Sequence, residues 1–234
     1  MTRRPSRAGR GGSAPLRGLI FDLDGTLVDT LHEITAAMNG ALQKAGLSVV
    51  SRISVRSWVG DGPVRLVEKA LPAESQMVRA RVLRFLLEEF REEPLGRSLP
   101  YVGIEDLLAR LRTAELPMAV LSNKPHSAAV EIVAALFAPS TFVAVCGYRQ
   151  ASERKPDPAG ALDLATLMEL PPESVAIVGD TAVDIETARR GGLPSIAVTW
   201  GFRDRAELEV AGPTWLAGEA SEIWDLVWGQ RRRH

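Results

Sequence analysis

Carboxylates follow two of the short apolar runs in this 234-residue sequence. The first such run ends just before Asp22 and Asp24, and a later one ends just before Asp180 and Asp184. Side chains alternate along an extended chain, so we expect Asp22 and Asp24 to face the same side. Two carboxylates about 4 Å apart repel by roughly 4 kcal/mol at an effective dielectric near 20, so a cation is expected between them.

Groups that bind phosphate occur in three other places. Gly25 permits a sharp turn that leaves backbone amides free to face an anion. Ser122 ends another apolar run, and Lys155 lies in a proline-flanked loop. Each feature alone is commonly a turn, a cap or a surface charge. Together, a cluster of acidic oxygens with a lysine indicates a magnesium ion and a phosphoryl group.

Apolar runs and amphipathic stretches alternate along most of the chain, which positions these residues. The runs are bounded by turn residues and predict strands buried on both faces, at 19–21, 118–121, 142–145, 175–178 and 195–198. Helical spacing lies between them at 103–115, 126–137 and 158–170. This order predicts a doubly wound parallel α/β sheet, in which the chemically active residues share the carboxyl edge.

One long stretch interrupts the alternation. Residues 31–99 contain no clear strand, and helical patterns occupy 31–46, 63–71 and 75–93. We expect a small all-helical domain inserted over the sheet's carboxyl edge, with residues 16–30 and 100–234 forming the catalytic α/β core. Residues 1–15 hold four arginines, no acid and no apolar pattern, which predicts a disordered tail and leaves an organelle transit peptide as the alternative.

Composition excludes several classes of function. The chain has 28 basic and 29 acidic residues and no run long enough to span a membrane, so neither nucleic acid nor membrane is an expected partner. A single cysteine, Cys146, rules out an intramolecular disulfide. With no apolar segment typical of a secretory signal, the sequence predicts a cytoplasmic protein. The phosphate-binding groups described above, and not the composition, indicate a small phosphorylated metabolite as its partner.

The four motifs together resemble the haloacid dehalogenase superfamily. The matching segments are Asp22-Leu-Asp24-Gly-Thr26, Ser122-Asn123, Lys155-Pro156 and Gly179-Asp180 with Asp184, in the family's order. The resemblance implies a Rossmann-like core with a mobile helical cap. It also implies Mg²⁺ bound by Asp22, the Asp24 carbonyl and Asp180, with Asp184 behind the metal's ligands.

The resemblance further implies the chemical roles of the site residues. Asp22 would be the nucleophile that forms a phospho-aspartate, and Asp24 the general acid and then the general base. Ser122 and Lys155 would hold the phosphoryl group and the nucleophile. The dehalogenases lack the second aspartate, so Asp24 favours a phosphoryl substrate.

Within the superfamily, the sequence is most similar to phosphoglycolate phosphatases. Trp58-Val-Gly60-Asp61-Gly62 resembles their cap loop for substrate specificity, and Asn123 belongs to a similar stretch. Asp61 replaces a more usual asparagine and would repel a carboxylated substrate, whereas Arg65 and Lys69 could contact one. The expected reaction is hydrolysis of 2-phosphoglycolate. Pyrophosphate, a nucleoside monophosphate, a sugar phosphate in a mutase, or a regulatory protein without turnover remain alternatives.

Overall fold

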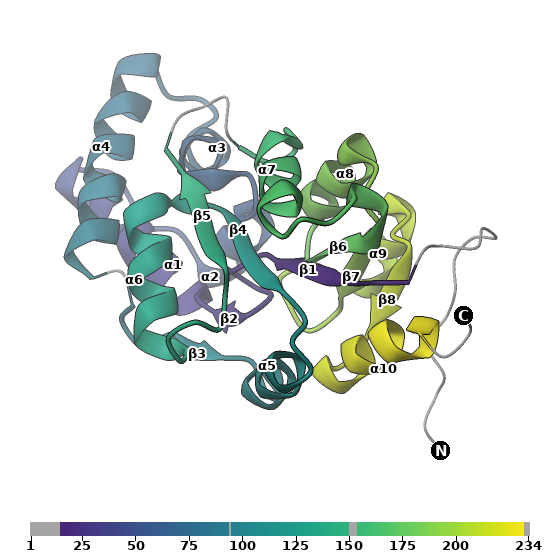
Figure 1. Ribbon diagram of the computed structural model, residues 1–234. Helices are drawn as coiled ribbons and strands as arrows, with labels where there is room; N and C mark the ends of the chain where they lie inside the picture. The colour runs from purple at the N-terminus through teal and green to yellow at the C-terminus, as the bar shows by residue number, and fades with distance from the viewer. Residues whose placement is uncertain (1–14, 94, 150–153, 232–234) are drawn as a thin grey trace.

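Six parallel strands form the central sheet of the protein, which was analysed as a computed structural model describing residues 15–93, 95–149 and 154–231 (Figure 1). The strands are β1 (Gly18–Phe21), β4 (Met118–Pro125), β5 (Ala144–Tyr148), β6 (Val175–Gly179), β7 (Ser195–Val198) and β8 (Trp215–Ala217). Their order across the sheet is β5-β4-β1-β6-β7-β8. Each neighbouring pair is parallel. The predicted fold class is confirmed.

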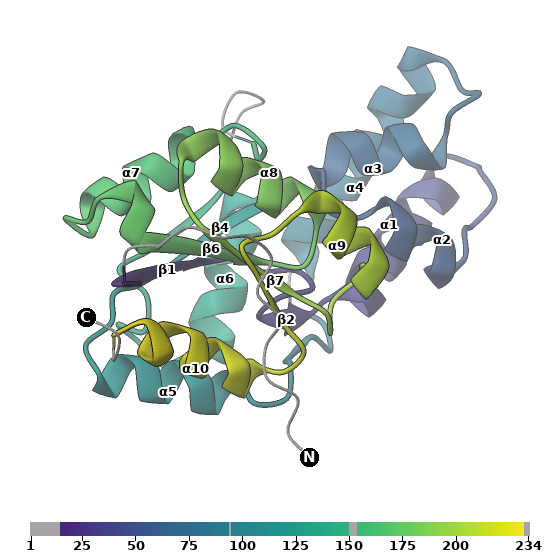
Figure 2. The same ribbon diagram turned by 90° about the vertical axis from the view of Figure 1, so that its right-hand side faces the viewer.

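Helices cover both faces of the sheet (Figure 2). One face packs against α5 (Ile104–Thr113), α6 (His126–Leu136) and α10 (Ala220–Arg231), and the other against α7 (Ala159–Leu167), α8 (Ala182–Gly191) and α9 (Arg205–Ala211). Side chains alternate along β1 and so reach both faces of the sheet. Leu19 and Phe21 pack on the face covered by α5, α6 and α10, and Ile20 packs on the face covered by α7 and α8. A short 3₁₀ helix, η2 (Pro172–Ser174), precedes β6.

Four helices follow β1 and lie to one side of the sheet (Figures 1 and 2). They are α1 (Leu31–Lys44), α2 (Arg52–Trp58), α3 (Gly62–Ala70) and α4 (Gln76–Glu92). Their apolar faces form a hydrophobic cluster of their own around Met38, Leu42 and Leu86. The antiparallel pair β2 (Val28–Asp29) and β3 (Leu99–Pro100) brings the two connections to the core together. These features support the predicted division at residues 31–99, which stays a prediction.

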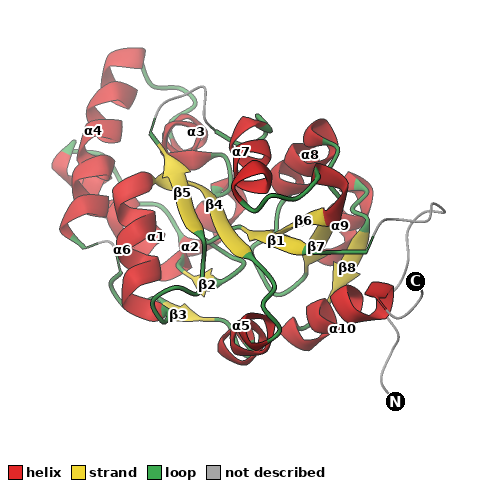
Figure 3. Ribbon diagram, in the orientation of Figure 1, coloured by secondary structure: helices red, strands yellow, loops and turns green. Residues whose placement is uncertain are grey.

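Several elements differ from the sequence prediction (Figure 3). The helix α2 was not predicted, because Val55 is its one buried side chain and no apolar face marks it. The strands β2 and β3 are two residues long, too short for alternation to show. The strand β8 was also missed, and β5 begins at Ala144 rather than at the predicted position 142. The predicted tail falls outside the described residues except for Pro15.

The loop after β7 joins the core to the four-helix region. Phe202 follows β7 in the chain, but its side chain packs into the hydrophobic cluster of the four helices. Arg56 of α2 donates to the carbonyls of Gly201 (3.0 Å) and Phe202 (2.9 Å). In return, Arg203 donates to the carbonyls of Arg56 (2.7 Å) and Val59 (2.5 Å). The two arginines satisfy backbone oxygens that the end of α2 and the loop leave without partners.

The helical cluster should contribute strongly to stability. Leu86 of α4 is completely buried, so Leu86→Ala is expected to lower the free energy of unfolding by about 2–5 kcal/mol through lost burial and a cavity. Met77 lies on the same helix with 80% of its surface exposed, and Met77→Ala should change that energy by less than about 0.5 kcal/mol. Urea unfolding of both variants measures the difference. Equal effects would contradict a packed core in this region.

No helix in the described ranges is both long enough and apolar enough to cross a membrane.

Candidate active site

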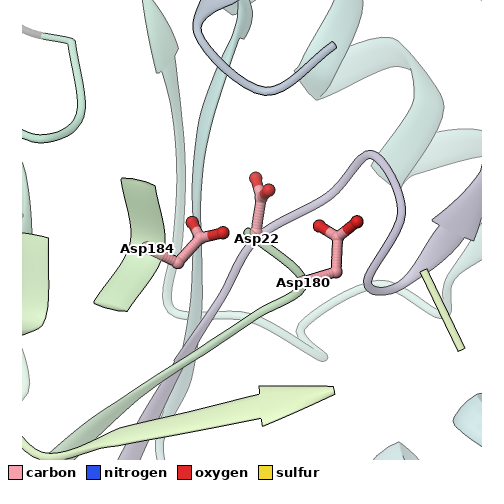
Figure 4. Close-up of side chains that lie close together, drawn as sticks. All are labelled: Asp22, Asp180 and Asp184. Carbon is pink, nitrogen blue, oxygen red and sulfur yellow. The ribbon is translucent and has the colours of Figure 1, made fainter. Parts of the chain in front are cut away.

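Three carboxylates converge at the carboxyl ends of the central strands (Figure 4). Asp22 follows β1, Asp180 follows β6, and Asp184 lies in the first turn of α8. One oxygen from each of the three lies within 4.8 Å of the others, and all three side chains are buried. The parallel sheet explains the convergence, because neighbouring strands end at the same edge.

Lys155 lies between two of these acids. Its Nζ atom is 2.8 Å from Oδ1 of Asp22 and 2.6 Å from Oδ1 of Asp184. The other oxygen of Asp184 accepts hydrogen bonds from the Thr181 backbone N–H (3.1 Å) and hydroxyl (2.7 Å). The bond from the backbone N–H belongs to a capping box at the start of α8. Both oxygens of Asp184 are therefore engaged, and this residue anchors the lysine.

Burial sets the protonation of the cluster. Desolvation, opposed by the charge of Lys155 and reinforced by Asp184, raises the pKa of Asp22 from 3.8 to about 7. Desolvation, with repulsion from Asp22 and Asp184, also raises the pKa of Asp180 well above its usual value. Burial alone would lower the pKa of Lys155, but attraction by Asp184 and Asp22 raises it. Lys155 therefore stays charged. A further cation would stabilise the ionised forms of Asp22 and Asp180.

Two hydrogen bonds hold the Asp180 carboxylate in place. Its Oδ2 accepts a hydrogen bond from the Phe202 N–H (2.7 Å), and its Oδ1 accepts one from the Thr26 hydroxyl (3.3 Å). Gly25 adopts a φ of 87°, and a Cβ atom there would collide with the Asp180 carboxylate. Gly25 therefore lets the Asp180 carboxylate lie close to the backbone after Asp24, and it also permits the turn.

The donor set fits a hard divalent cation. Asp22 and Asp180 offer buried carboxylate oxygens at one point, and oxygen ligands of this kind suit Mg²⁺. Asp24 lies outside this carboxylate cluster, so its predicted contact with the metal depends on its backbone carbonyl. The raised pKa values of Asp22 and Asp180 also favour a cation here, because a bound cation would relieve the repulsion between the carboxylates.

Lys124 is a site residue that the sequence reasoning missed. Its side chain is buried, and its Nζ atom lies 3.0 Å from Oδ1 of Asp24 and 5.0 Å from the centre of the Phe90 ring of α4. Lys124 is two residues after Ser122 in β4, and in a regular strand this spacing would place both side chains on one side. That spacing was the signal available in the sequence.

Ser122 and Asn123 end up at the same edge with different surroundings. The Ser122 hydroxyl is buried and accepts a hydrogen bond from the Lys124 N–H (3.2 Å). The Asn123 side chain accepts from the Lys155 N–H (2.9 Å) and donates to the carbonyls of Lys155 and Gly60, each at 3.1 Å. Asn123 therefore fixes the lysine loop and ties it to the helical region. Its predicted contact with substrate stays a prediction.

The predicted specificity loop separates into two environments. Gly60 and Gly62 line the cavity that contains Asp22 and Asp24. Asp61 instead lines a neighbouring hollow, where its carboxylate is 2.6 Å from Lys69 Nζ. The expected repulsion by Asp61 is thus countered by a cation.

The cavity above Asp22 encloses about 40 Å³, room for roughly three water molecules. Its floor comes from the core, through Asp22, Asp24, Ser122, Asn123, Lys124 and Pro125. Its roof comes from the four-helix region and is largely apolar, through Ile34, Val59, Gly60, Gly62, Pro63, Leu66 and Phe90. A small polar floor under an apolar roof favours a compact substrate shielded from water.

Known proteins share both the sequence pattern and the fold. The family model described as haloacid dehalogenase-like hydrolase matches residues 19–198. A phosphoglycolate phosphatase from Chromobacterium violaceum is 30% identical over 217 residues, covering 91% of this chain and 96% of the relative. One from Mesorhizobium japonicum is 31% identical over 191 residues, covering 80% and 84%.

A solved structure agrees with these relatives. The crystal structure of a candidate phosphoglycolate phosphatase from Lactobacillus delbrueckii superposes with a TM-score of 0.85 at 28% identity, covering 91% of this chain and 98% of the other. The family match spans most of the chain and includes all four predicted motifs. The protein therefore belongs to the haloacid dehalogenase-like hydrolases and is a phosphatase of that family.

Proposed function

We propose that the protein is a magnesium-dependent phosphomonoesterase that hydrolyses 2-phosphoglycolate to glycolate and phosphate through a phospho-aspartate on Asp22. The observation that carries this proposal is the buried group of Asp22, Asp180 and Asp184 with Lys155 in contact with two of them, beneath a small cavity. The relatives named phosphoglycolate phosphatase support the choice of substrate.

Asp22 is arranged to attack a phosphorus atom. Its Oδ1 is held by the Leu23 N–H (2.7 Å) and by Lys155 Nζ (2.8 Å). Within the described part of the chain, its Oδ2 accepts no hydrogen bond, which leaves that oxygen as the nucleophile. Attack forms the Oδ2–P bond and breaks the bond between phosphorus and the leaving oxygen. Lys155, and potentially the Ser122 hydroxyl, would balance the charge on the phosphoryl oxygens.

Bound Mg²⁺ would neutralise charge on the phosphoryl group and on the two acids that hold it. Asp22, Asp180 and the Asp24 carbonyl are the proposed ligands, because the oxygens of Asp184 are already engaged by Lys155 and Thr181.

Asp24 supplies the proton transfers in this scheme. Its side chain lines the cavity beside Asp22. Protonated Asp24 would give its proton to the leaving glycolate oxygen, which avoids expelling an alkoxide. The resulting carboxylate would then take a proton from the water that attacks phosphorus, and cleavage of the P–Oδ2 bond would release phosphate and regenerate Asp22.

The relatives named phosphoglycolate phosphatase favour the small substrate over the alternatives. Sugar phosphates and nucleoside monophosphates carry leaving groups larger than glycolate, and a substrate panel tests them directly. Pyrophosphate is compact as well and carries an anionic second phosphate, so kinetics must separate it from 2-phosphoglycolate. A regulatory protein without turnover would have the same geometry, so kinetics must separate that possibility.

Phosphate release with magnesium should show a preference for 2-phosphoglycolate over pyrophosphate, nucleoside monophosphates and hexose phosphates. Asp22→Asn should lower kcat by at least about 10⁴-fold, because it removes the nucleophile. Asp163 is exposed on α7, and Asp163→Asn should leave the rate unchanged. Faster hydrolysis of another compound in the panel would show that 2-phosphoglycolate is not the preferred substrate. Magnesium binding without any turnover would instead favour the regulatory protein.

The raised pKa of Asp22 should make the metal-free protein less stable as the pH rises. The unfolded carboxyl titrates near 3.8 and the folded one near 7, so the folded state holds an extra proton between those values. Stability from this group is therefore lost as the pH rises through that window. Relative to Asp22→Asn, wild-type protein in chelator should lose more than about 1 kcal/mol of unfolding free energy between pH 5 and pH 8.

Urea unfolding across that pH range measures the difference, with Asp163→Asn as the control for a general loss of one negative charge. A gap between wild type and Asp22→Asn that stays constant with pH would contradict the shift at Asp22.

A further inference from the structure

Lys124 is the cation of the substrate cavity. It is 6% exposed, and it is the one positively charged side chain among the described residues that line the space above Asp22. Asp24 from the core and Phe90 from α4 lie on either side of its ammonium group, at 3.0 Å from Oδ1 and 5.0 Å from the ring centre. The ammonium is therefore held between the two halves of the cavity.

Three other cations near the cavity pair with acids. Arg65 pairs with Glu68 at 2.6 Å, and Lys69 pairs with Asp61 at 2.6 Å. Neither Arg65 nor Lys69 lines the cavity. Lys155 is used between Asp22 and Asp184. The sequence offered Arg65 and Lys69 as residues that could contact a substrate carboxylate, but Lys124 is the cation that lines the cavity.

Lys124 has donors to spare. An ammonium group carries three N–H donors. In the described residues, the Asp24 carboxylate accepts one hydrogen bond from it, and the Phe90 ring supplies an aromatic contact. The side chains of the roof residues Val59 and Leu66 are apolar and offer no acceptor to the ammonium group. In such an environment, an anionic group on the substrate is the strongest available partner for the remaining donors.

We infer that Lys124 binds a carboxylate on the leaving group and makes the enzyme selective for phosphate esters of short hydroxy acids. Because Lys124 adjoins Asp24, which delivers the proton to the leaving oxygen, the carboxylate must lie within a bond or two of the carbon that bears the ester. This inference rests on the proposed function and identifies the residue that distinguishes 2-phosphoglycolate from neutral phosphate esters.

The test compares 2-phosphoglycolate with its neutral amide, 2-phosphooxyacetamide. Lys124→Met removes the charge at similar length, and the ratio of kcat/KM for acid over amide should fall about 10–100-fold, mainly through KM. Lys124→Arg keeps the charge and should restore part of the ratio. Lys44→Met removes an exposed lysine of α1 that pairs with Glu89, and should leave the ratio unchanged.

Equal losses on acid and amide in Lys124→Met would overturn the inference, because they would mean that Lys124 acts only by positioning Asp24. Circular dichroism and thermal unfolding establish that each variant is folded. If Lys124→Met does not fold, the comparison of acid and amide binding to wild-type protein still decides the inference.

A binding measurement separates this inference from the proposed function. If wild-type protein hydrolyses neither ester, the proposed function fails, but the role of Lys124 is still decided by calorimetry on magnesium-loaded protein. The probes are 3-phosphonopropionate, a carboxylated analogue that cannot be hydrolysed, and its amide. The acid should bind at least about tenfold more tightly than the amide in wild type and lose that advantage in Lys124→Met. Equal affinities of acid and amide for wild type would overturn the inference.

Discussion

Repulsion among buried carboxylates is the constraint around which this protein is organised. Asp22, Asp180 and Asp184 meet at one point away from water, where each charge raises the cost of the others. Lys155 offsets part of that cost, and Asp184 and Asn123 in turn hold Lys155 by its ammonium and its backbone. The residual negative charge favours binding of a metal cation, which is the basis of the proposed magnesium site. A neutral site of the same shape would be easier to fold and would not favour a cation.

The sheet and the four helices each form one side of the cavity above these carboxylates. The ends of β1 and β4 supply the floor of the cavity, and its groups are the ones proposed to react with or hold the phosphoryl oxygens. The four helices supply a roof that is largely apolar and excludes water, which strengthens every electrostatic interaction beneath it. Lys124 is the point where the two meet, since it contacts Asp24 below and Phe90 above. In the proposed scheme, chemistry and substrate choice belong to different parts of the chain but share Lys124.

Much of this arrangement was predictable because the relevant signals are local. Buried parallel strands appear as short apolar runs, and the acids that follow them must share an edge, so the grouping of Asp22 with Asp180 followed from the pattern. The helix α2 was missed because a single buried residue cannot produce the helical spacing of apolar residues by which helices are recognised in a sequence. Lys124 was missed because a lysine at a strand end is ordinarily a solvated charge, and only the tertiary contact with Asp24 gives it a role. The pairing of Asp61 with Lys69 likewise depends on how the loop turns relative to α3.

The loop after β7 carries a consequence for how such enzymes diversify. Phe202 packs among the four helices while its N–H holds Asp180, and Arg56 and Arg203 exchange hydrogen bonds across the same junction. The helical insert is continuous in sequence, but its packing surface includes a segment more than a hundred positions later. A chimera that transplants residues 31–99 alone would therefore break contacts that also steady a proposed metal ligand. Recombination should preserve activity only when the insert and residues 199–203 are inherited together.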